Sequence, residues 1–179
     1  MIMNKAGGLV LLLGCLIGTA GTAENGDETL APEQFSAPNE GLPQASQAPA
    51  IFVSEANTHI QSQQFQQALA DIEAALTLAP GNSEYRFLRC LLKERLGEPL
   101  SLAKTCYTQV VDQLSQGGDN LCETNINCVA ADLMAEASQA ERRKQRFLAL
   151  PASAVESEMR HYVLDGFDRD EYLNTILPQ

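Results

Sequence analysis

The residues with the clearest capacity for chemistry are the cysteines, which stand at Cys15, Cys90, Cys106, Cys122 and Cys128. Cysteines form disulfides in oxidising compartments, hold structural zinc, or take part in thiol exchange. No two of them have the two-residue gap of the usual zinc knuckle or redox pair, and neither histidine lies near them in sequence. The spacing therefore favours disulfides over a zinc site or a redox centre.

Side chains that could support catalysis are sparse. His59 and His161 are isolated, and the chain has no glycine-rich phosphate loop and no glycine-flanked nucleophilic serine. We therefore expect no enzyme, no catalytic residue, no cofactor and no metal. A calcium site is the competing interpretation of an acidic run, but the order of its residues does not match a calcium loop: Asp165, Asp168, Asp170 and Glu171.

One basic cluster stands out in this acidic sequence, formed by Arg142, Arg143, Lys144 and Arg146. At 100° per residue, Arg142, Arg143 and Arg146 share about a third of a helix surface. They also lie near the end of a predicted helix, where the dipole favours positive charge. The cluster is interpreted either as a solvated helix face or as a docking site for an acidic partner.

The N-terminal residues 1–23 have the features of a secretory signal peptide. Lys5 supplies the positive end, residues 9–17 form a short apolar run, and Gly21, Thr22 and Ala23 form a small-residue cleavage site. The apolar run is too short to span a membrane. Cleavage after Ala23 predicts a periplasmic or secreted protein.

Cys15 offers an alternative to that cleavage site, because residues 12–15 loosely resemble a lipoprotein processing site. Lipidation of Cys15 would anchor the protein to a membrane surface. Cleavage after Ala23 uses the whole apolar run and is the preferred interpretation. Membrane contact is therefore expected only if Cys15 is lipidated.

Residues 24–49 are predicted to form a disordered leader, because they hold five acids, no Lys or Arg, and four of the chain's eight prolines. Without residues 1–23 the chain has 11 basic and 23 acidic residues, a formal charge of −12. Such a charge repels nucleic acid and anionic lipid. We therefore expect no nucleic-acid partner.

Helical periodicity organises the rest of the chain, most clearly over residues 65–82. Phe65, Ala68, Leu69, Ile72, Ala75, Leu76 and Leu78 follow three- and four-residue steps, so they lie largely on one helix side. Ala68 and Ala75 allow a neighbouring helix to approach closely. Pro80, Gly81 and Asn82 then end the helix.

This stretch resembles the second helix of a tetratricopeptide repeat. The resemblance covers residues 49–82, with a first helix at residues 50–62, Phe52 at the large aromatic position and Ala56 at a small one. Glu55 departs from the family, which has leucine there. Residues 83–116 resemble a degenerate second repeat whose terminal proline is replaced by Gly117 and Gly118.

The second repeat is expected to hold two helices. Asn82 or Ser83 caps the first, whose apolar face is Tyr85, Leu88, Leu92 and Leu96. The second begins at Pro99 and carries Leu102, Cys106, Val110 and Leu114 on one side. The repeat register places Cys90 and Cys106 on facing sides of this hairpin, which favours that pair and leaves Cys122 with Cys128.

Residues 50–178 are thus predicted to form an all-α domain, a short array of antiparallel helices like that of the tetratricopeptide family. A long helix at about residues 128–148 comes first after the repeats. Two shorter helices follow, with capping-box spacings at Ser153 with Glu156 and at Asp168 with Glu171. These three helices are expected to cap the array.

The expected function is that of a non-catalytic module that binds a protein or peptide in the bacterial cell envelope. The alternative is a periplasmic inhibitor or immunity protein that neutralises an exported toxic enzyme. The resemblance implies that the first helix of each repeat lines the binding face, so the candidate contacts there are Phe52, His59, Tyr85 and Arg89. Gene neighbourhood would separate the two functions.

The mature protein is predicted to begin at Glu24 and to hold no free thiol, because the four remaining cysteines form an even set in an exported chain. Intact mass and thiol titration of the native protein check both points together. A lipid-sized mass increment on Cys15, or four titratable thiols, would contradict this prediction.

Overall fold

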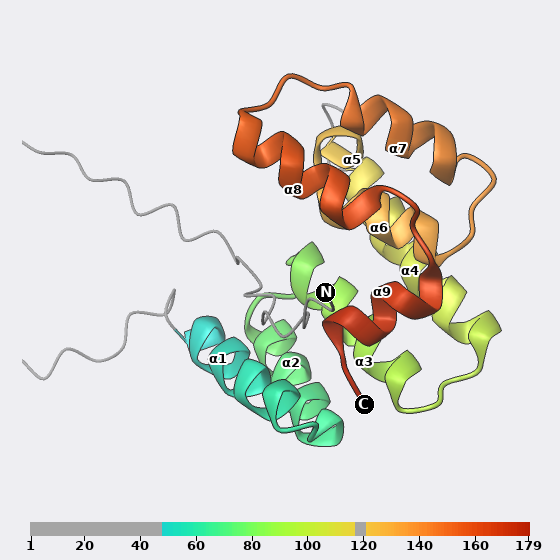
Figure 1. Ribbon diagram of the computed structural model, residues 1–179. Helices are drawn as coiled ribbons and strands as arrows, with labels where there is room; N and C mark the ends of the chain where they lie inside the picture. The colour runs from blue at the N-terminus through green and yellow to red at the C-terminus, as the bar shows by residue number, and fades with distance from the viewer. Residues whose placement is uncertain (1–47, 117–120) are drawn as a thin grey trace, which may run out of the picture. The chain divides into compact units, whose positions relative to one another are not determined.

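The computed structural model describes residues 48–116 and 121–179, which form nine α-helices and no strand (Figure 1). These residues belong to one compact unit. The predicted all-α class is confirmed. The predicted signal peptide, Cys15 and all but the last two residues of the predicted leader lie outside the described residues.

The first hairpin pairs α1 (Ala48–Gln61) with α2 (Phe65–Leu78). α1 includes the last two residues of the predicted leader, Ala48 and Pro49. Pro49 is tolerated there because the N–H groups of a first helical turn lack helical partners. Ala56, Ala68 and Ala75 are fully buried, as their small size predicts. Leu78 was expected on the packed side, but it is 52% exposed at the end of α2.

The turn between α1 and α2 places Gln63 in the left-handed region, at φ 58°. This conformation costs a non-glycine residue roughly 1–2 kcal/mol. Two backbone hydrogen bonds close the turn, from Gln63 N to Ile60 O at 2.9 Å and from Gln64 N to His59 O at 2.8 Å. They satisfy the last carbonyl groups of α1 and offset that cost.

The second hairpin joins α3 (Ser83–Arg95) to α4 (Leu100–Gln116). Asn82 caps α3 by accepting a hydrogen bond from Tyr85 N at 3.0 Å, and Gly97 closes the helix at φ 93°. α3 packs against α2, α4 and α6, so it buries more of its surface than the predicted stripe. Its buried residues are Phe87, Cys90, Leu91 and Leu92.

The buried face of α4 differs from the prediction. Leu102 was expected inside but is 53% exposed, whereas Ala103 and Tyr107 are fully buried. The neighbours of α4 account for this difference. α4 packs against α6 as well as α3, so the centre of its buried face moves to Ala103, Tyr107, Val110 and Val111.

The predicted long helix at residues 128–148 is wrong, because the chain forms α5 (Leu121–Thr124), α6 (Ile126–Met134) and α7 (Ala140–Leu148). Glu136 takes the left-handed conformation at φ 54°, and Ala137 N donates to Asp132 O at 3.1 Å. This turn ends α6 and lets α7 fold back against it. The return brings Phe147 onto Val129 and Leu164 in a second, smaller core.

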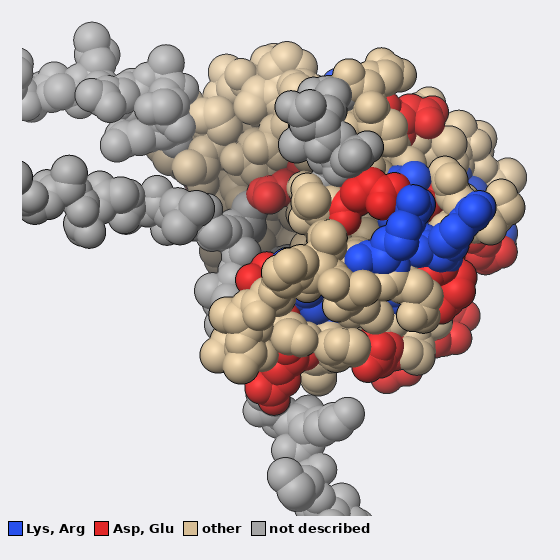
Figure 2. Space-filling model, turned by 90° about the horizontal axis from the view of Figure 1, so that it is seen from above, with Lys and Arg blue, Asp and Glu red and all other residues tan. Residues whose placement is uncertain are grey.

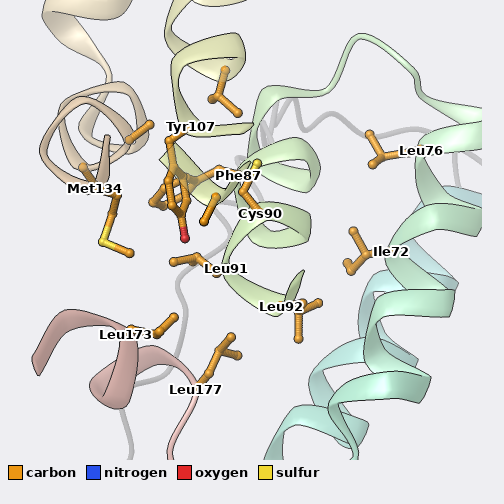
Figure 3. Packing of buried hydrophobic residues seen from close by; sticks show 14 of the residues in the cluster. Ile72, Leu76, Phe87, Cys90, Leu91, Leu92, Tyr107, Met134, Leu173 and Leu177 are labelled. Atoms are coloured by element: carbon orange, nitrogen blue, oxygen red, sulfur yellow. The ribbon is translucent and has the colours of Figure 1, made fainter. Parts of the chain in front are cut away.

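The last two helices are α8 (Ala154–Leu164) and α9 (Arg169–Ile176). Ser153 accepts a hydrogen bond from Glu156 N at 3.2 Å, and Asp168 accepts one from Glu171 N at 2.8 Å, so both predicted caps are confirmed. α8 packs on α7. The segment with α9 instead returns to the main core, where Leu173 and Leu177 lie with Leu91 and Leu92 (Figure 3).

A partly buried polar cluster beside the main core links four helices. Tyr107 of α4 donates to Glu94 Oε2 of α3 at 2.7 Å, and Arg169 of α9 lies 2.5 Å from Glu94 Oε1. Arg169 also donates through Nε to Met134 O of α6 at 3.1 Å. Burial, followed by the hydrogen bond to Glu94, raises the pKa of Tyr107 well above its usual value. The phenol therefore remains a neutral donor.

Ala68→Leu should destabilise the fold more than Ala70→Leu. Ala68 is fully buried against its neighbours, where added methylene groups cost about 1–3 kcal/mol, whereas Ala70 is exposed on the same helix. Urea unfolding of both variants measures the difference. Equal free energies of unfolding would contradict the packing of α2 described above.

Candidate interaction surface

α3 carries four basic side chains, at Arg86, Arg89, Lys93 and Arg95, against two acidic ones, Glu84 and Glu94. None of the four cations forms an ion pair within the described part of the chain. Outside α3, Arg142 is the only Lys or Arg of the described residues without such a pair. The others all have an acidic partner: Lys104, Arg143, Lys144, Arg146, Arg160 and Arg169.

Three of these cations share one side of α3. At 100° per residue, Arg86, Arg89 and Lys93 lie within about 60° around the helix axis. All three are half-buried, as is common for long cationic side chains whose alkyl stems cover apolar surface. We call this set the α3 cationic face.

The charges of the α3 cationic face are incompletely satisfied. Arg86 donates to Pro80 O through Nε at 2.9 Å and Nη2 at 2.6 Å, which fixes its side chain without neutralising it. Arg89 has a buried Nε with no hydrogen-bond partner in the described structure. This Nε is not accessible from solvent, so an anionic ligand would have to bind the Nη groups of Arg89, and charge-assisted hydrogen bonds of this kind are strong.

The acids of α3 are placed where they cannot neutralise this face. Glu94 is committed to Tyr107 and Arg169 beside the main core. Glu84 lies about 160° from Arg86 around the helix axis. The two acids therefore leave the α3 cationic face without an internal counter-charge.

Tyr85 adjoins the α3 cationic face, about 40° from Arg89 around the helix. Its ring is partly buried against the main core. Burial, and to a lesser degree the charge of Glu84, raises the pKa of Tyr85, so its hydroxyl is a neutral donor at physiological pH. Tyr85 and Arg89 thus lie near each other on α3.

The two candidate contacts on α1, Phe52 and His59, already contact other residues of the fold. Phe52 is partly buried against the main core. His59 Nδ1 lies 2.7 Å from Asp71 Oδ2 of α2, which ties the first hairpin together. Both side chains therefore already have a structural role within the first hairpin.

Of the four basic residues of α7, two are exposed and two are buried. Figure 2 shows a compact group of Lys and Arg side chains with acidic side chains beside it. Arg142 and Arg146 are exposed, and Arg146 pairs with Glu123 at 3.0 Å. Arg143 is only 6% exposed, which contradicts its expected place on the solvated side.

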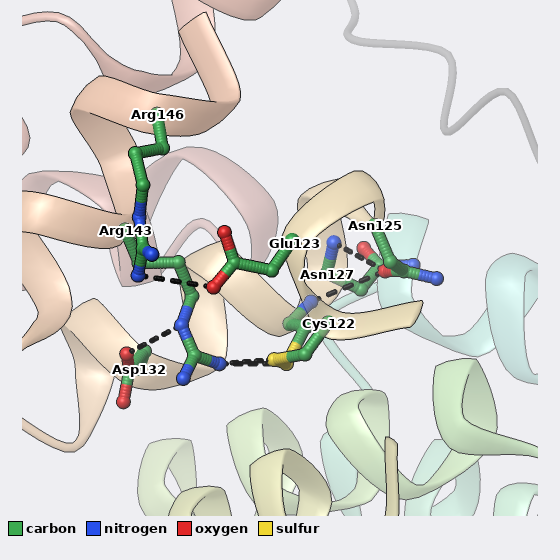
Figure 4. Close-up of a disulfide and its surroundings, with 8 residues drawn as sticks. Cys122, Glu123, Asn125, Asn127, Asp132, Arg143 and Arg146 are labelled. Atoms are coloured by element: carbon green, nitrogen blue, oxygen red, sulfur yellow. Dashed lines mark hydrogen bonds and ion pairs between the residues drawn. A yellow bond between two sulfur atoms is a disulfide. The ribbon is translucent and has the colours of Figure 1, made fainter. Parts of the chain in front are cut away.

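Arg143 is buried because α7 folds back on α6 and the nearby disulfide. Its Nε lies 3.2 Å from Asp132 Oδ2, and its Nη1 contacts the sulfur atoms of Cys122 and Cys128 (Figure 4). Burial raises the pKa of Asp132, and the Arg143 charge opposes that shift. Arg143 therefore acts as an internal counter-charge and is not available to a partner.

The cysteines form the two expected disulfides. Cys90 pairs with Cys106 across the second hairpin, with Cα atoms 5.7 Å apart, and Cys122 pairs with Cys128 at 5.2 Å. Each closes a short loop and is expected to stabilise the fold by about 2–3 kcal/mol. Two disulfides fit an oxidising environment outside the cytoplasm.

None of the helices in residues 48–116 and 121–179 is both long and apolar enough to cross a membrane. In the same residues, no three His, Cys, Asp or Glu side chains gather in a group that could hold a metal ion.

Sequence reasoning missed Arg86 and Lys93, although their spacing around Arg89 was visible. Steps of three and four residues between cations indicate one helix side, and the two nearest acids fall elsewhere. It also missed three exposed apolar residues on α8, namely Val155, Met159 and Tyr162. They too are spaced by four and three residues.

Arg143→Met should cost about 3–5 kcal/mol of unfolding free energy, because it leaves the Asp132 carboxylate buried without its counter-charge. Arg142→Met, on the same helix but exposed, should change stability by less than about 0.5 kcal/mol. Urea unfolding of both variants measures this contrast.

The cost of Arg143→Met should also depend on pH. The buried Asp132 has a raised pKa, so its protonated form is favoured in the folded state, and the penalty should grow as pH rises through that pKa. We expect a larger loss at neutral pH than at about pH 4. Equal losses for the Arg142 and Arg143 variants would contradict the buried ion pair.

Comparison of the chain with protein-family models, with curated proteins and with solved structures gives no match. Its function therefore has to be inferred from the side chains themselves, from their burial, their partners and their charge. Among the described residues, the α3 cationic face is the largest group of cations without an acidic partner.

Proposed function

We propose that this protein is an exported, non-catalytic interaction module that binds an acidic segment of a partner protein on the α3 cationic face. One observation carries the proposal. Arg86, Arg89 and Lys93 share one helix side without an ion pair among the described residues, in a chain whose formal charge is −11. A surplus of acids offers many internal partners, so an unpaired basic face favours an external anion.

The residue types on this face suit protein recognition. Arginine and tyrosine dominate the energetic anchors of protein interfaces, and arginine binds carboxylates with two parallel hydrogen bonds. Half-buried charges are also less screened by salt than exposed ones. Arg89 and Tyr85 are therefore the proposed anchors, with Arg86 and Lys93 adding electrostatic attraction.

The fold supports this role by holding α3 in place. α3 packs against α2, α4 and α6, and the Cys90–Cys106 disulfide joins it to α4. A rigid face loses little conformational entropy on binding, which leaves more of the contact energy as affinity. We propose that the two hairpins are a short tetratricopeptide-like array and that the protein acts in the periplasm or after secretion.

Binding of an acidic probe tests the proposed site. Tyr85→Ala with Arg89→Ala should weaken the affinity for a short fluorescein-labelled peptide of Glu and Ala residues by more than tenfold. Fluorescence anisotropy measures the affinity, and circular dichroism checks that the fold is intact. Arg142→Ala with Arg146→Ala is the matched control, because it removes two exposed cations from α7 and should have little effect.

The acidic leader should be dispensable for this binding. Deleting residues 24–47 is expected to change the affinity by less than about tenfold, or about 1.4 kcal/mol. A silent Tyr85 and Arg89 variant would contradict the proposed site. A larger loss of affinity in the Arg142 and Arg146 variant would instead assign the binding site to α7.

A further inference from the structure

α8 presents three large apolar side chains to solvent in regular order. Val155, Met159 and Tyr162 are 76%, 43% and 66% exposed. Their spacing of four and three residues places them within about 60° around the helix axis. We call them the α8 apolar stripe. They extend along the helix for about 10 Å, at a rise of 1.5 Å per residue.

The fold does not need this stripe, because α8 is held by its opposite side. Leu164 is fully buried in the second core with Phe147 and Val129. Arg160 lies over the Phe147 ring at 4.6 Å and donates to Phe147 O and Leu150 O at 3.4 and 3.3 Å. A surface helix normally places polar residues on its outer side. The stripe is therefore an unused apolar surface.

Carboxylates border the α8 apolar stripe on both sides. By helical position, Glu158 lies on one side and Glu156 on the other. Glu158 forms no ion pair among the described residues, whereas Glu156 pairs with Arg160 at 2.5 Å. Asp165, at the end of the helix, pairs with His161 at 2.9 Å. Glu158 is thus the carboxylate at the border of the stripe that has no ion-pair partner among the described residues.

We propose that the α8 apolar stripe binds a basic amphipathic helix of a partner protein. Apolar side chains of that helix would cover Val155, Met159 and Tyr162, and its Lys or Arg side chains would lie against Glu156 and Glu158. A stripe that follows a helix axis is complementary to a second helix. The apolar side chains along one side of that second helix would be the anchors. Met159 adapts to partners of different shape, and Tyr162 is a preferred interface anchor.

Charge distinguishes this occupant from the competing ones. A second copy of the chain would bring the carboxylates of two such borders together, with no cation in the stripe to pair with them. An anionic lipid surface would be repelled by the same carboxylates. The site is independent of the α3 cationic face, which has the opposite charge.

The test measures binding of the purified full chain to a synthetic fluorescein-labelled helix with Leu on one side and Lys on the other. Fluorescence anisotropy should detect this peptide and show at least tenfold weaker binding of a matched helix with Glu in place of Lys. Val155→Ser with Tyr162→Ser should weaken the Lys helix at least tenfold. Both positions are exposed, so the fold should remain intact by circular dichroism.

The control variant is Leu78→Ser with Leu102→Ser, which removes two apolar side chains away from α8 that are 52% and 53% exposed. It should leave binding unchanged. Neither variant alters charge, so non-specific attraction of the basic peptide to this acidic protein would affect both equally. Equal binding by both variants, or no binding by the wild type, would overturn the proposal.

Two further measurements identify a different occupant. Sedimentation that shows a dimer which the Val155 and Tyr162 variant abolishes would assign the stripe to a second copy. Binding of the wild type, but not of this variant, to vesicles containing phosphatidylglycerol would assign it to lipid. Either result would overturn the proposal, whereas a monomer that does not bind the vesicles supports it.

Discussion

The partly buried carboxylate of Glu94 is the constraint on which the arrangement of helices depends. A charge inside a protein is costly unless it is paired and hydrogen-bonded, and breaking such a pair costs several kcal/mol. Glu94 on α3 obtains its partners from Tyr107 of α4 and Arg169 of α9, and Arg169 also reaches Met134 O of α6. Satisfying one carboxylate therefore fixes four helices relative to one another, including the C-terminal α9.

The same constraint shapes the surface of the molecule. With Glu94 paired to Arg169, Arg86, Arg89 and Lys93 of the same helix have no acidic partner among the described residues. On α7 the reverse occurs, because Arg143 turns inward to pair with Asp132 and the exposed Arg146 is neutralised by Glu123. In the sequence, α7 has the denser cluster of basic residues. In the structure, α3 has more basic side chains without an acidic partner among the described residues. α8 adds an apolar surface bordered by carboxylates, so the two proposed sites prefer partners of opposite charge.

Features controlled by local interactions could be predicted from the sequence. α2 ends at Leu78, just before the stop predicted at Pro80, and Asn82, Ser153 and Asp168 cap their helices because a short polar side chain reaches an N–H three residues ahead. Features that depend on distant partners could not be predicted. The break at Glu136 has no glycine or proline to indicate it, and the burial of Arg143 requires Asp132 and the Cys122–Cys128 disulfide to lie beside α7. Of the predicted binding residues, Tyr85 and Arg89 remain in the proposed site, but the cations beside Arg89 emerged only from the ion pairs.

The central claim is that the unpaired cations of α3, and not those of α7, receive an acidic ligand. The most direct measurement is an NMR titration that follows the Nε–H signals of the arginine side chains as the Glu and Ala peptide is added. The signals of Arg89 and Arg86 should shift, because the guanidinium group of each has no acidic partner in the described structure and would be perturbed by a bound carboxylate. The signals of Arg142 and Arg146 should remain unchanged. Shifts confined to the α7 arginines, with Arg86 and Arg89 unaffected, would contradict this account.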